Sequence, residues 1–126
     1  MDKAEFIEKL EKLNLPGTEY IILSGGSLLL RGIRDQTADL DITVSKSLAA
    51  ALDLYHCPKD DYGLYNPFPG VQMKDDMEDF RFDLVDGYQC ETLEQILEQK
   101  RKWNRPKDQK DIEMILSYKK AGPDST

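Results

Sequence analysis

The sequence has few of the residues that define several protein classes. Its 126 residues include two cysteines, Cys57 and Cys90, one histidine and one tryptophan. The cysteines show no paired spacing, which argues against a disulfide framework and predicts free thiols in a reducing compartment. The histidine, His56, stands beside Cys57. No second ligand pair follows at a suitable spacing, so a zinc site is not expected.

Long apolar runs and an excess of basic charge are missing too. No apolar stretch approaches the length that spans a bilayer, and no signal peptide is visible. Acidic residues outnumber basic ones by 24 to 17, giving a net charge of −7, which argues against a surface that coats nucleic acid. We expect a soluble, cytoplasmic protein with no membrane partner. The length predicts one domain over residues 1–120 and a flexible tail over 121–126.

Hydrophobic periodicity predicts a mixture of helices and strands, typical of an α/β fold. The expected helices cover residues 3–13, 27–33, 48–54 and 92–103, with a last helix from Pro106, and the expected strands cover residues 20–23, 39–44, 71–73 and 80–85. Residues 58–70 are rich in Pro, Gly, Asp and Asn, which favours a loop or an irregular hairpin.

A glycine pair follows the first expected strand. Gly25 and Gly26 end that strand where a helix should begin. A helix N-terminus that glycines leave open offers free N–H groups and a positive dipole end to an anion, and Ser27 adds a hydroxyl donor. We therefore expect Gly25, Gly26 and Ser27 to hold a triphosphate, whose approach a side chain at Gly26 would obstruct. A glycine pair after a strand is otherwise most often only a tight turn.

Two carboxylates lie on one face of the next expected strand. Residues 39–44 alternate between polar and apolar, so Asp39 and Asp41 share one face and the apolar residues share the other. Neighbouring carboxylates repel each other unless a cation neutralises them, and magnesium prefers such hard oxygen ligands. The pair predicts a Mg²⁺ site. An Asp-x-Asp pair at a strand end is otherwise usually a solvated edge or a turn. The pattern also occurs in glycosyltransferases, where it holds a metal on a nucleotide-sugar diphosphate, but that fold needs a longer chain.

The segments 25–41 and 105–112 together carry a family resemblance. The first resembles the signature of the nucleotidyltransferase superfamily, which has the polymerase-beta-like fold. It is most similar to the small bacterial branch with an arginine and a Ser/Thr before the acid pair, here Arg34 and Thr37. That branch includes AbiEii-type toxins and lincosamide-type antibiotic nucleotidyltransferases. Arg31 and Arg34 are consistent with plain surface charges, and equally with a loop arginine that contacts a triphosphate or orders the acid-pair strand. The resemblance implies a mixed β-sheet that carries the acids, with helices packed mainly on one side.

Segment 105–112 resembles the Arg-x-Lys-Asp-x-x-Asp-Ile motif that opens a C-terminal helix in that branch. The resemblance implies that Lys107 reaches the triphosphate, while Asp108 and Asp111 brace the helix. Residues 100–110 hold six of the seventeen basic residues and Trp103. Such a run is typical of a solvated helix face, and also of nucleic-acid binding through charge and stacking.

Nucleotidyl transfer calls for a third carboxylate, because an acceptor hydroxyl is a poor nucleophile until a base or a metal withdraws its proton. Asp83 is flanked by Phe82 and Leu84, so alternation predicts that it points away from them. Asp86 is the competing candidate, but it stands next to Gly87 at the strand end, as turn residues do. The resemblance supports Asp83, because the family places its third acid on a later strand.

The sequence thus predicts a metal-dependent nucleotidyltransferase. It would move a nucleoside monophosphate from an NTP to an acceptor hydroxyl, with Asp39, Asp41 and Asp83 holding two Mg²⁺ ions. The acceptor stays open among a small molecule such as an antibiotic, a tRNA end and a protein. The alternative is a non-catalytic module that binds a nucleotide or a partner, as one half of a toxin–antitoxin pair. A homodimer or a cognate partner protein fits either hypothesis.

Overall fold

The structure is a computed structural model that describes residues 1–121. It divides into two compact units, one covering Met1–Glu91 and the other beginning at Thr92. We describe each unit by itself. Most of the tail expected at residues 121–126 lies outside the described residues.

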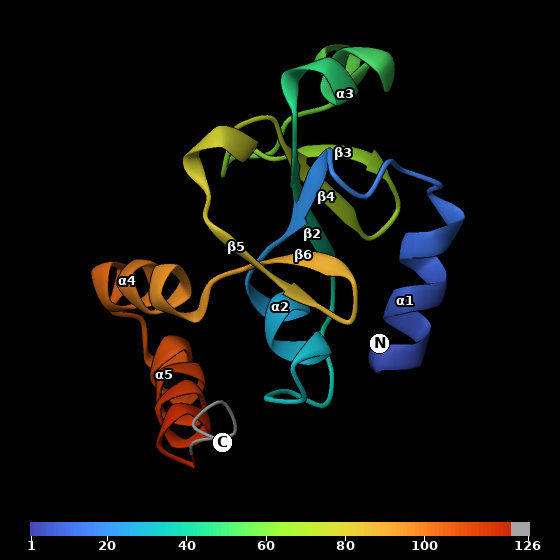
Figure 1. Cartoon of the computed structure of the whole chain (residues 1–126). Helices are drawn as coiled ribbons and strands as arrows, with labels where there is room; N and C mark the ends of the chain where they lie inside the picture. Colours follow the sequence, from blue (N-terminus) through green and yellow to red (C-terminus); the bar gives the residue numbers. More distant parts are fainter. Residues whose placement is uncertain (122–126) are drawn as a thin grey trace. The chain divides into compact units, whose positions relative to one another are not determined.

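The first unit contains a mixed six-stranded sheet with the strand order β3-β4-β2-β1-β6-β5 (Figure 1). Strand β1 pairs antiparallel with β2 and parallel with β6, and β2 pairs parallel with β4. The outer pairs, β3 with β4 and β5 with β6, are antiparallel hairpins. The strand bounds are Tyr20–Ile22 for β1, Leu40–Val44 for β2, Tyr65–Phe68 for β3, Val71–Lys74 for β4, Phe82–Val85 for β5 and Tyr88–Glu91 for β6.

The helices mostly begin where local capping signals lie. In this unit they are α1 (Lys3–Lys12), α2 (Ser24–Leu30) and α3 (Lys46–Ala51), with short 3₁₀ turns η1 (Leu54–His56) and η2 (Met77–Asp79). Helix α1 opens with a capping box between Asp2 and Glu5, and Ser45 caps α3 by accepting from the N–H of Leu48. Each cap satisfies an N–H that the first turn leaves without a helical partner.

The two faces of the sheet differ in what they contact. Ile22, Ile42 and Cys90 lie in one row across β1, β2 and β6, and they share a buried cluster with side chains of α1 and α2. We call this the helix face. Because side chains alternate along a strand, Ile21 and Asp41 point to the other side, which we call the second face.

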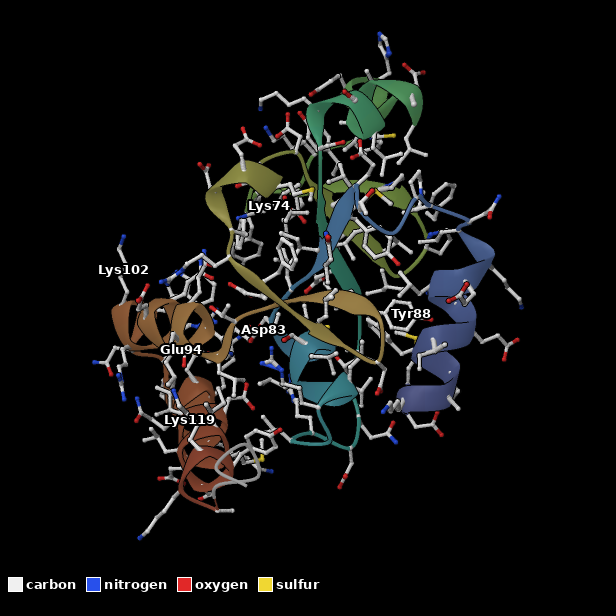
Figure 2. All side chains as sticks on the ribbon, in the orientation of Figure 1. Lys74, Asp83, Tyr88, Glu94, Lys102 and Lys119 are labelled. Carbon is white, nitrogen blue, oxygen red and sulfur yellow. The ribbon has the colours of Figure 1, made fainter. Side chains whose placement is uncertain are left out.

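The second unit consists of α4 (Leu93–Trp103) and α5 (Pro106–Lys120). Thr92 caps α4 by accepting from the N–H of Gln95, as its spacing in the sequence predicts, and Pro106 stands in the first turn of α5. Lys119 and Glu94 pair at 2.8 Å between the two helices (Figure 2).

The α/β class that the sequence predicts is confirmed by the mixed sheet of the first unit and the helices of both units.

Candidate functional site

The acid pair lies at the start of β2. Leu40 and Ile42 are buried on the helix face, whereas Asp41 is partly buried on the second face and Asp39, just before the strand, is exposed. The backbone carbonyl of Asp41 accepts a hydrogen bond from the N–H of Leu23 at 2.9 Å. That bond anchors the start of β2 to the segment that leads into α2. The alternation expected for residues 39–44 is observed within the strand, over Leu40–Val44, and Asp39 precedes it.

The carboxylate of Asp41 is partly buried and has a strongly raised pKa. Burial, together with the smaller effects of the charges of Asp39 and Asp60, raises the pKa of Asp41 to about 6. Its Oδ1 atom is buried and has no hydrogen-bond partner among the described residues. A buried acceptor without a donor costs free energy, and a cation beside it would remove that cost. The arrangement therefore fits a bound cation.

Asp60 is a carboxylate that sequence reasoning did not single out. It stands in the loop before β3, where its Oδ1 atom accepts from the N–H groups of Tyr62 at 2.9 Å and Leu64 at 3.0 Å. These hydrogen bonds, led by that from Leu64, lower the pKa of Asp60. The sequence offered one signal: an aspartate just before a turn, where its side chain can accept from the backbone N–H two residues further on. Only folding brings its charge within the influence of Asp41.

The strand beside β2 supplies an amide. In the parallel register of β2 and β4, Gln72 is the direct partner of Asp41.

No cluster of three or more His, Cys, Asp or Glu side chains within residues 1–121 is placed to hold a metal ion. Magnesium commonly takes only one or two carboxylates from the protein and completes its shell with water and substrate phosphates. Asp39 and Asp41 meet that smaller requirement.

The start of α2 is occupied by protein groups. The N–H of Ser24 donates to Oε1 of the buried Glu91 at 2.9 Å, and the hydroxyl of Ser27 donates to the carbonyl of Glu91 at 2.8 Å. Ser27 is fully buried. The expectation that Ser27 contacts a phosphate must therefore be corrected. The reason is tertiary, since β6 runs parallel to β1 and ends beside the first turn of α2.

The two glycines have different surroundings. A Cβ atom on Gly26 would lie 2.6 Å from Cζ of Phe6 and 2.7 Å from Cγ2 of Ile22. Gly26 thus permits core packing, which corrects the expectation that it borders a phosphate. A Cβ atom on Gly25 would lie 2.7 Å from Oγ1 of Thr37 and 2.9 Å from Nη1 of Arg34. The structure therefore brings Gly25 together with Arg34, two of the expected nucleotide-binding residues.

Asp83 lies on a different face from the acid pair. It is the direct partner of Cys90 on β6, and Cys90 in turn is aligned with Ile22 on β1. This row belongs to the helix face, and β5 is separated from β2 by β1 and β6. The structure does not bring Asp83 together with Asp41. Alternation correctly separated Asp83 from Phe82, but it could not say which face of the sheet either residue joins.

Polar side chains of the β5–β6 hairpin pair with residues of α1, and Figure 2 labels Tyr88 near that helix. Asp86 pairs with Lys3 of α1 at 2.8 Å. The hydroxyl of Tyr88 donates to Glu11, and this hydrogen bond is the main reason that the pKa of Tyr88 rises to about 12. The carboxylate of this hairpin that shares the second face with Asp41 is Glu91, the direct partner of Phe82. Sequence reasoning missed it together with β6.

Lys107 belongs to the second unit, where it is exposed in the first turn of α5. Behind it, buried Lys100 lies 3.4 Å from Oδ1 of Asp108 and 3.1 Å from Oδ2 of Asp111. Arg105 contacts Asp108 through two nitrogens, at 2.6 and 3.1 Å. Asp108 and Asp111 therefore join α5 to α4. The basic run is only partly a solvated face, because Lys100 points inward.

Comparison with known proteins finds no matching family model, no matching curated protein and no matching solved structure. None of the helices within residues 1–121 has both the length and the apolar character needed to cross a membrane.

Proposed function

We propose that this protein is a metal-dependent nucleotidyltransferase that moves a nucleoside monophosphate from an NTP to an acceptor hydroxyl and releases pyrophosphate. One observation carries the proposal. The partly buried carboxylate of Asp41 has an oxygen with no hydrogen-bond partner among the described residues. It lies within the electrostatic influence of Asp39 and Asp60. Carboxylates held in this way, against their mutual repulsion, are typical of sites that bind a cation.

In this proposal Asp39 and Asp41 hold Mg²⁺. The bound ion would neutralise phosphate charge and polarise the phosphoryl oxygen. Gly25 leaves room for the side chains of Thr37 and Arg34, and Arg34 would supply a guanidinium for the phosphates. Ser24 is held in place by Glu91, which makes Glu91 a positioning residue for this segment. Binding of the triphosphate by Lys107 stays a prediction from the resemblance, whereas Asp83 has no role in this proposal because it lies on the helix face.

A test of the proposal is transfer of labelled nucleotide. The purified chain is incubated with Mg²⁺, each of the four α-³²P-labelled NTPs, and the small-molecule, RNA and protein fractions of a cell extract. We expect label to enter one fraction, and we expect Asp41→Asn to reduce that transfer by orders of magnitude. Asp86→Asn is the matched control, because Asp86 pairs with Lys3 on an exposed turn. Full transfer by Asp41→Asn would refute the proposal.

The second candidate is a non-catalytic module that binds a nucleotide or a partner protein, as in a toxin–antitoxin pair. The position of Asp83 on the helix face favours it, since the strand next to Asp41 supplies Gln72 rather than a further carboxylate. Mg²⁺-dependent NTP binding without transfer to any fraction would support this alternative. Both cysteines are free, which fits a cytoplasmic location under either candidate.

A further inference from the structure

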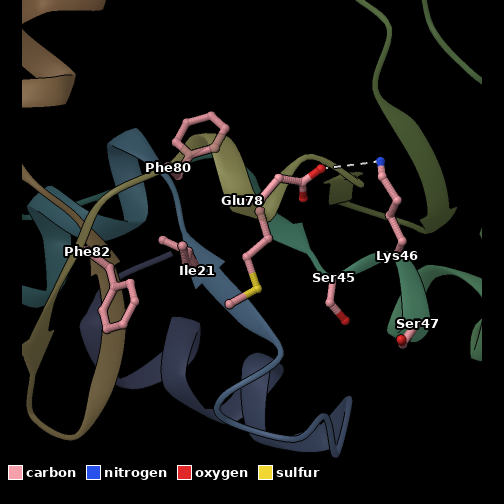
Figure 3. A pocket seen from close by; sticks show the side chains of 8 residues that line it. Ile21, Ser45, Lys46, Ser47, Glu78, Phe80 and Phe82 are labelled. Carbon is pink, nitrogen blue, oxygen red and sulfur yellow. Dashed lines mark ion pairs between the residues drawn. The ribbon is translucent and has the colours of Figure 1, made fainter.

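A pocket of about 500 Å³ lies at the second face of the sheet, within the first unit (Figure 3). Four apolar side chains form part of its lining: Ile21 of β1, Met77 of η2, Phe80, and Phe82 of β5. Ligand pockets of small molecules fall in this size range and combine apolar walls with a few polar groups. Phe82 is 44% exposed, so part of this residue is accessible to a ligand.

The pocket shares its face with the acid pair. Ile21 is the direct partner of Thr43, and Asp41 lies two residues before Thr43 on the same face. With ordinary strand spacing, the Cα atoms of Ile21 and Asp41 are roughly 8 Å apart. A small molecule in the pocket would therefore lie on the same side of the sheet as Asp41, close to the proposed site of transfer.

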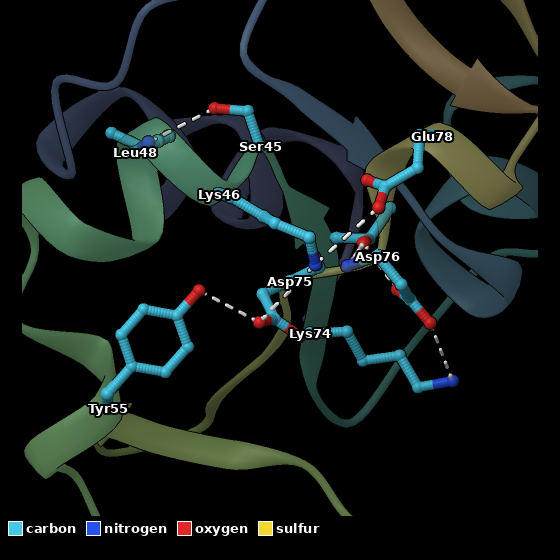
Figure 4. Close-up of polar contacts among 9 residues, drawn as sticks. Ser45, Lys46, Leu48, Tyr55, Lys74, Asp75, Asp76 and Glu78 are labelled. Carbon is cyan, nitrogen blue, oxygen red and sulfur yellow. Dashed lines mark hydrogen bonds and ion pairs between the residues drawn. The ribbon is translucent and has the colours of Figure 1, made fainter.

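The charged groups at the pocket do not favour an anion. Lys46 lies 3.5 Å from Glu78 and donates to the carbonyl of Asp75 at 3.2 Å, so its charge is already matched (Figure 4). The carboxylates, with Glu78 acting most strongly, raise the pKa of Lys46. Ser45 donates to a further carboxylate, that of Glu19, at 2.9 Å. Two carboxylates, those of Glu78 and Asp75, thus lie beside the one ammonium, and the carboxylate of Glu19 lies against Ser45, so a ligand carboxylate would be repelled.

Hydrogen bonds hold the rim of the pocket in place. Tyr55 donates to Asp75 at 2.9 Å. The buried Thr43 donates to Asp76 at 2.7 Å and accepts from the N–H of Asp76 at 3.2 Å. These bonds hold the turn that carries Met77 and Glu78 against the end of β2, so the pocket wall is fixed by the fold (Figure 4).

We propose that this pocket binds a small molecule with an aromatic ring and a neutral or cationic substituent, and that this molecule is the acceptor of the transfer reaction. The acceptor role rests on the proposed function, whereas the binding site does not. Among the three acceptor classes that the sequence left open, the pocket thus favours the small molecule. Phe82 offers its ring for stacking and for contact with a cation, whereas the ring of Phe80 already has the ammonium of Lys74 over it, 5.8 Å from the ring centroid.

The test uses two probes that share a ring and differ in charge, tyramine and 4-hydroxyphenylacetate. Binding to the metal-free chain is followed by the ¹³C-methyl NMR signals of Ile21 and Met77. We expect tyramine to shift both signals and the carboxylate probe to bind roughly tenfold more weakly, about 1.4 kcal/mol. Phe82→Ser should weaken tyramine binding. Leu84→Ser is the matched control, because Leu84 is 71% exposed on the same strand and does not line the pocket.

Three outcomes would refute the proposed binding site. These are no shift with either probe, tighter binding of the carboxylate probe, or equal weakening by Phe82→Ser and Leu84→Ser. The acceptor role is tested separately in the labelled-NTP assay. If label enters the small-molecule fraction with wild type but not with Phe82→Ser, the pocket holds the acceptor. If tyramine binds as expected but no fraction is labelled, the proposed function fails and the binding site stands.

Discussion

The guanidinium of Arg31 lies 3.0 Å from the carboxylate of Asp83. Arg31 caps the C-terminus of α2, and its side chain is only 6% exposed, whereas that of Asp83 is 58% exposed. The contact fastens the β5–β6 hairpin to the helix face of the sheet. Asp83 therefore has a structural partner on the face opposite to that of Asp41, and this pairing accounts for its position without a role in metal binding.

Replacing Asp83 should affect stability more than nucleotide binding. In Asp83→Asn the buried guanidinium loses its ionic partner, and we expect the free energy of unfolding to fall by about 1–2 kcal/mol, given the exposure of the carboxylate. Urea denaturation measures this change, and calorimetry should show unaltered Mg²⁺-NTP affinity.

The matched control is Asp86→Asn on the same hairpin. Lys3 and Asp86 are both about half exposed, so this change should cost less than about 0.5 kcal/mol. If Asp83→Asn keeps its stability and loses Mg²⁺-NTP affinity instead, the carboxylate acts at the nucleotide and the role assigned here to Arg31 is wrong.

Asp41 should make stability depend on pH in a defined window. Its pKa is raised from 3.8 to about 6 in the folded chain. Between these values the folded state binds more protons than the unfolded state, so stability falls as pH rises through the window. Asp41→Asn should remove this loss of stability. At neutral pH its free energy of unfolding should exceed that of the wild type by up to about 3 kcal/mol. Urea denaturation at intervals from pH 4 to 7 measures the slope.

Asp39→Asn is the graded control, since it removes one repelling charge and leaves the burial of Asp41 unchanged. Asp39→Asn should therefore recover a smaller part of the stability that the wild type loses as the pH rises through this window. Because protons compete with a cation for Asp41, Mg²⁺ should raise the melting temperature of the wild type more at pH 7.5 than at pH 5. An identical pH slope in wild type and Asp41→Asn would contradict the raised pKa.

The two glycines of α2 should respond differently to a methyl group. Gly26→Ala places a Cβ atom 2.6 Å from Phe6 and 2.7 Å from Ile22, and overpacking of this kind costs about 1–3 kcal/mol. Gly25→Ala meets the ends of the Thr37 and Arg34 side chains, which can move, so it should cost less. Thermal unfolding measures both.

Under the proposed function, Gly25→Ala should in turn lose more NTP affinity than its stability change explains, and isothermal titration calorimetry measures that loss. Greater destabilisation by Gly25→Ala than by Gly26→Ala would show that the packing assigned to Gly26 is wrong.

Lys100 should be a strong determinant of stability in the second unit. It is only 5% exposed and lies between Asp108 and Asp111. Lys100→Met removes a buried cation from two carboxylates, and we expect a loss of about 3 kcal/mol. Helical circular dichroism during urea denaturation measures it.

Lys102→Met, on the same helix but exposed, should change stability by less than about 0.5 kcal/mol. Equal effects of the two variants would mean that Lys100 acts as an ordinary surface charge.

Local patterns in the sequence predicted much of the fold. The alternation of residues 39–44 indicated that Leu40, Ile42 and Val44 share one buried face of β2, and Thr92 with Gln95 marked the start of α4. These features depend on neighbours a few residues away, which the sequence displays directly. Strand β6 was missed because Tyr88–Glu91 carries no clear apolar alternation. The start of α2 was placed late, at Ser27 rather than Ser24, because the glycines were interpreted as a break.

The remaining features of the candidate site depend on contacts between distant segments. Alternation in β5 separated Asp83 from Phe82, but the pairing of β5 with β6 and of β6 with β1 decided that Asp83 joins the helix face. Gly26 faces the core because Phe6 packs there. By itself the sequence determined the acid pair and its strand. Only the tertiary structure decided which groups share their face, because strand order and register are set by long-range packing that no local spacing encodes.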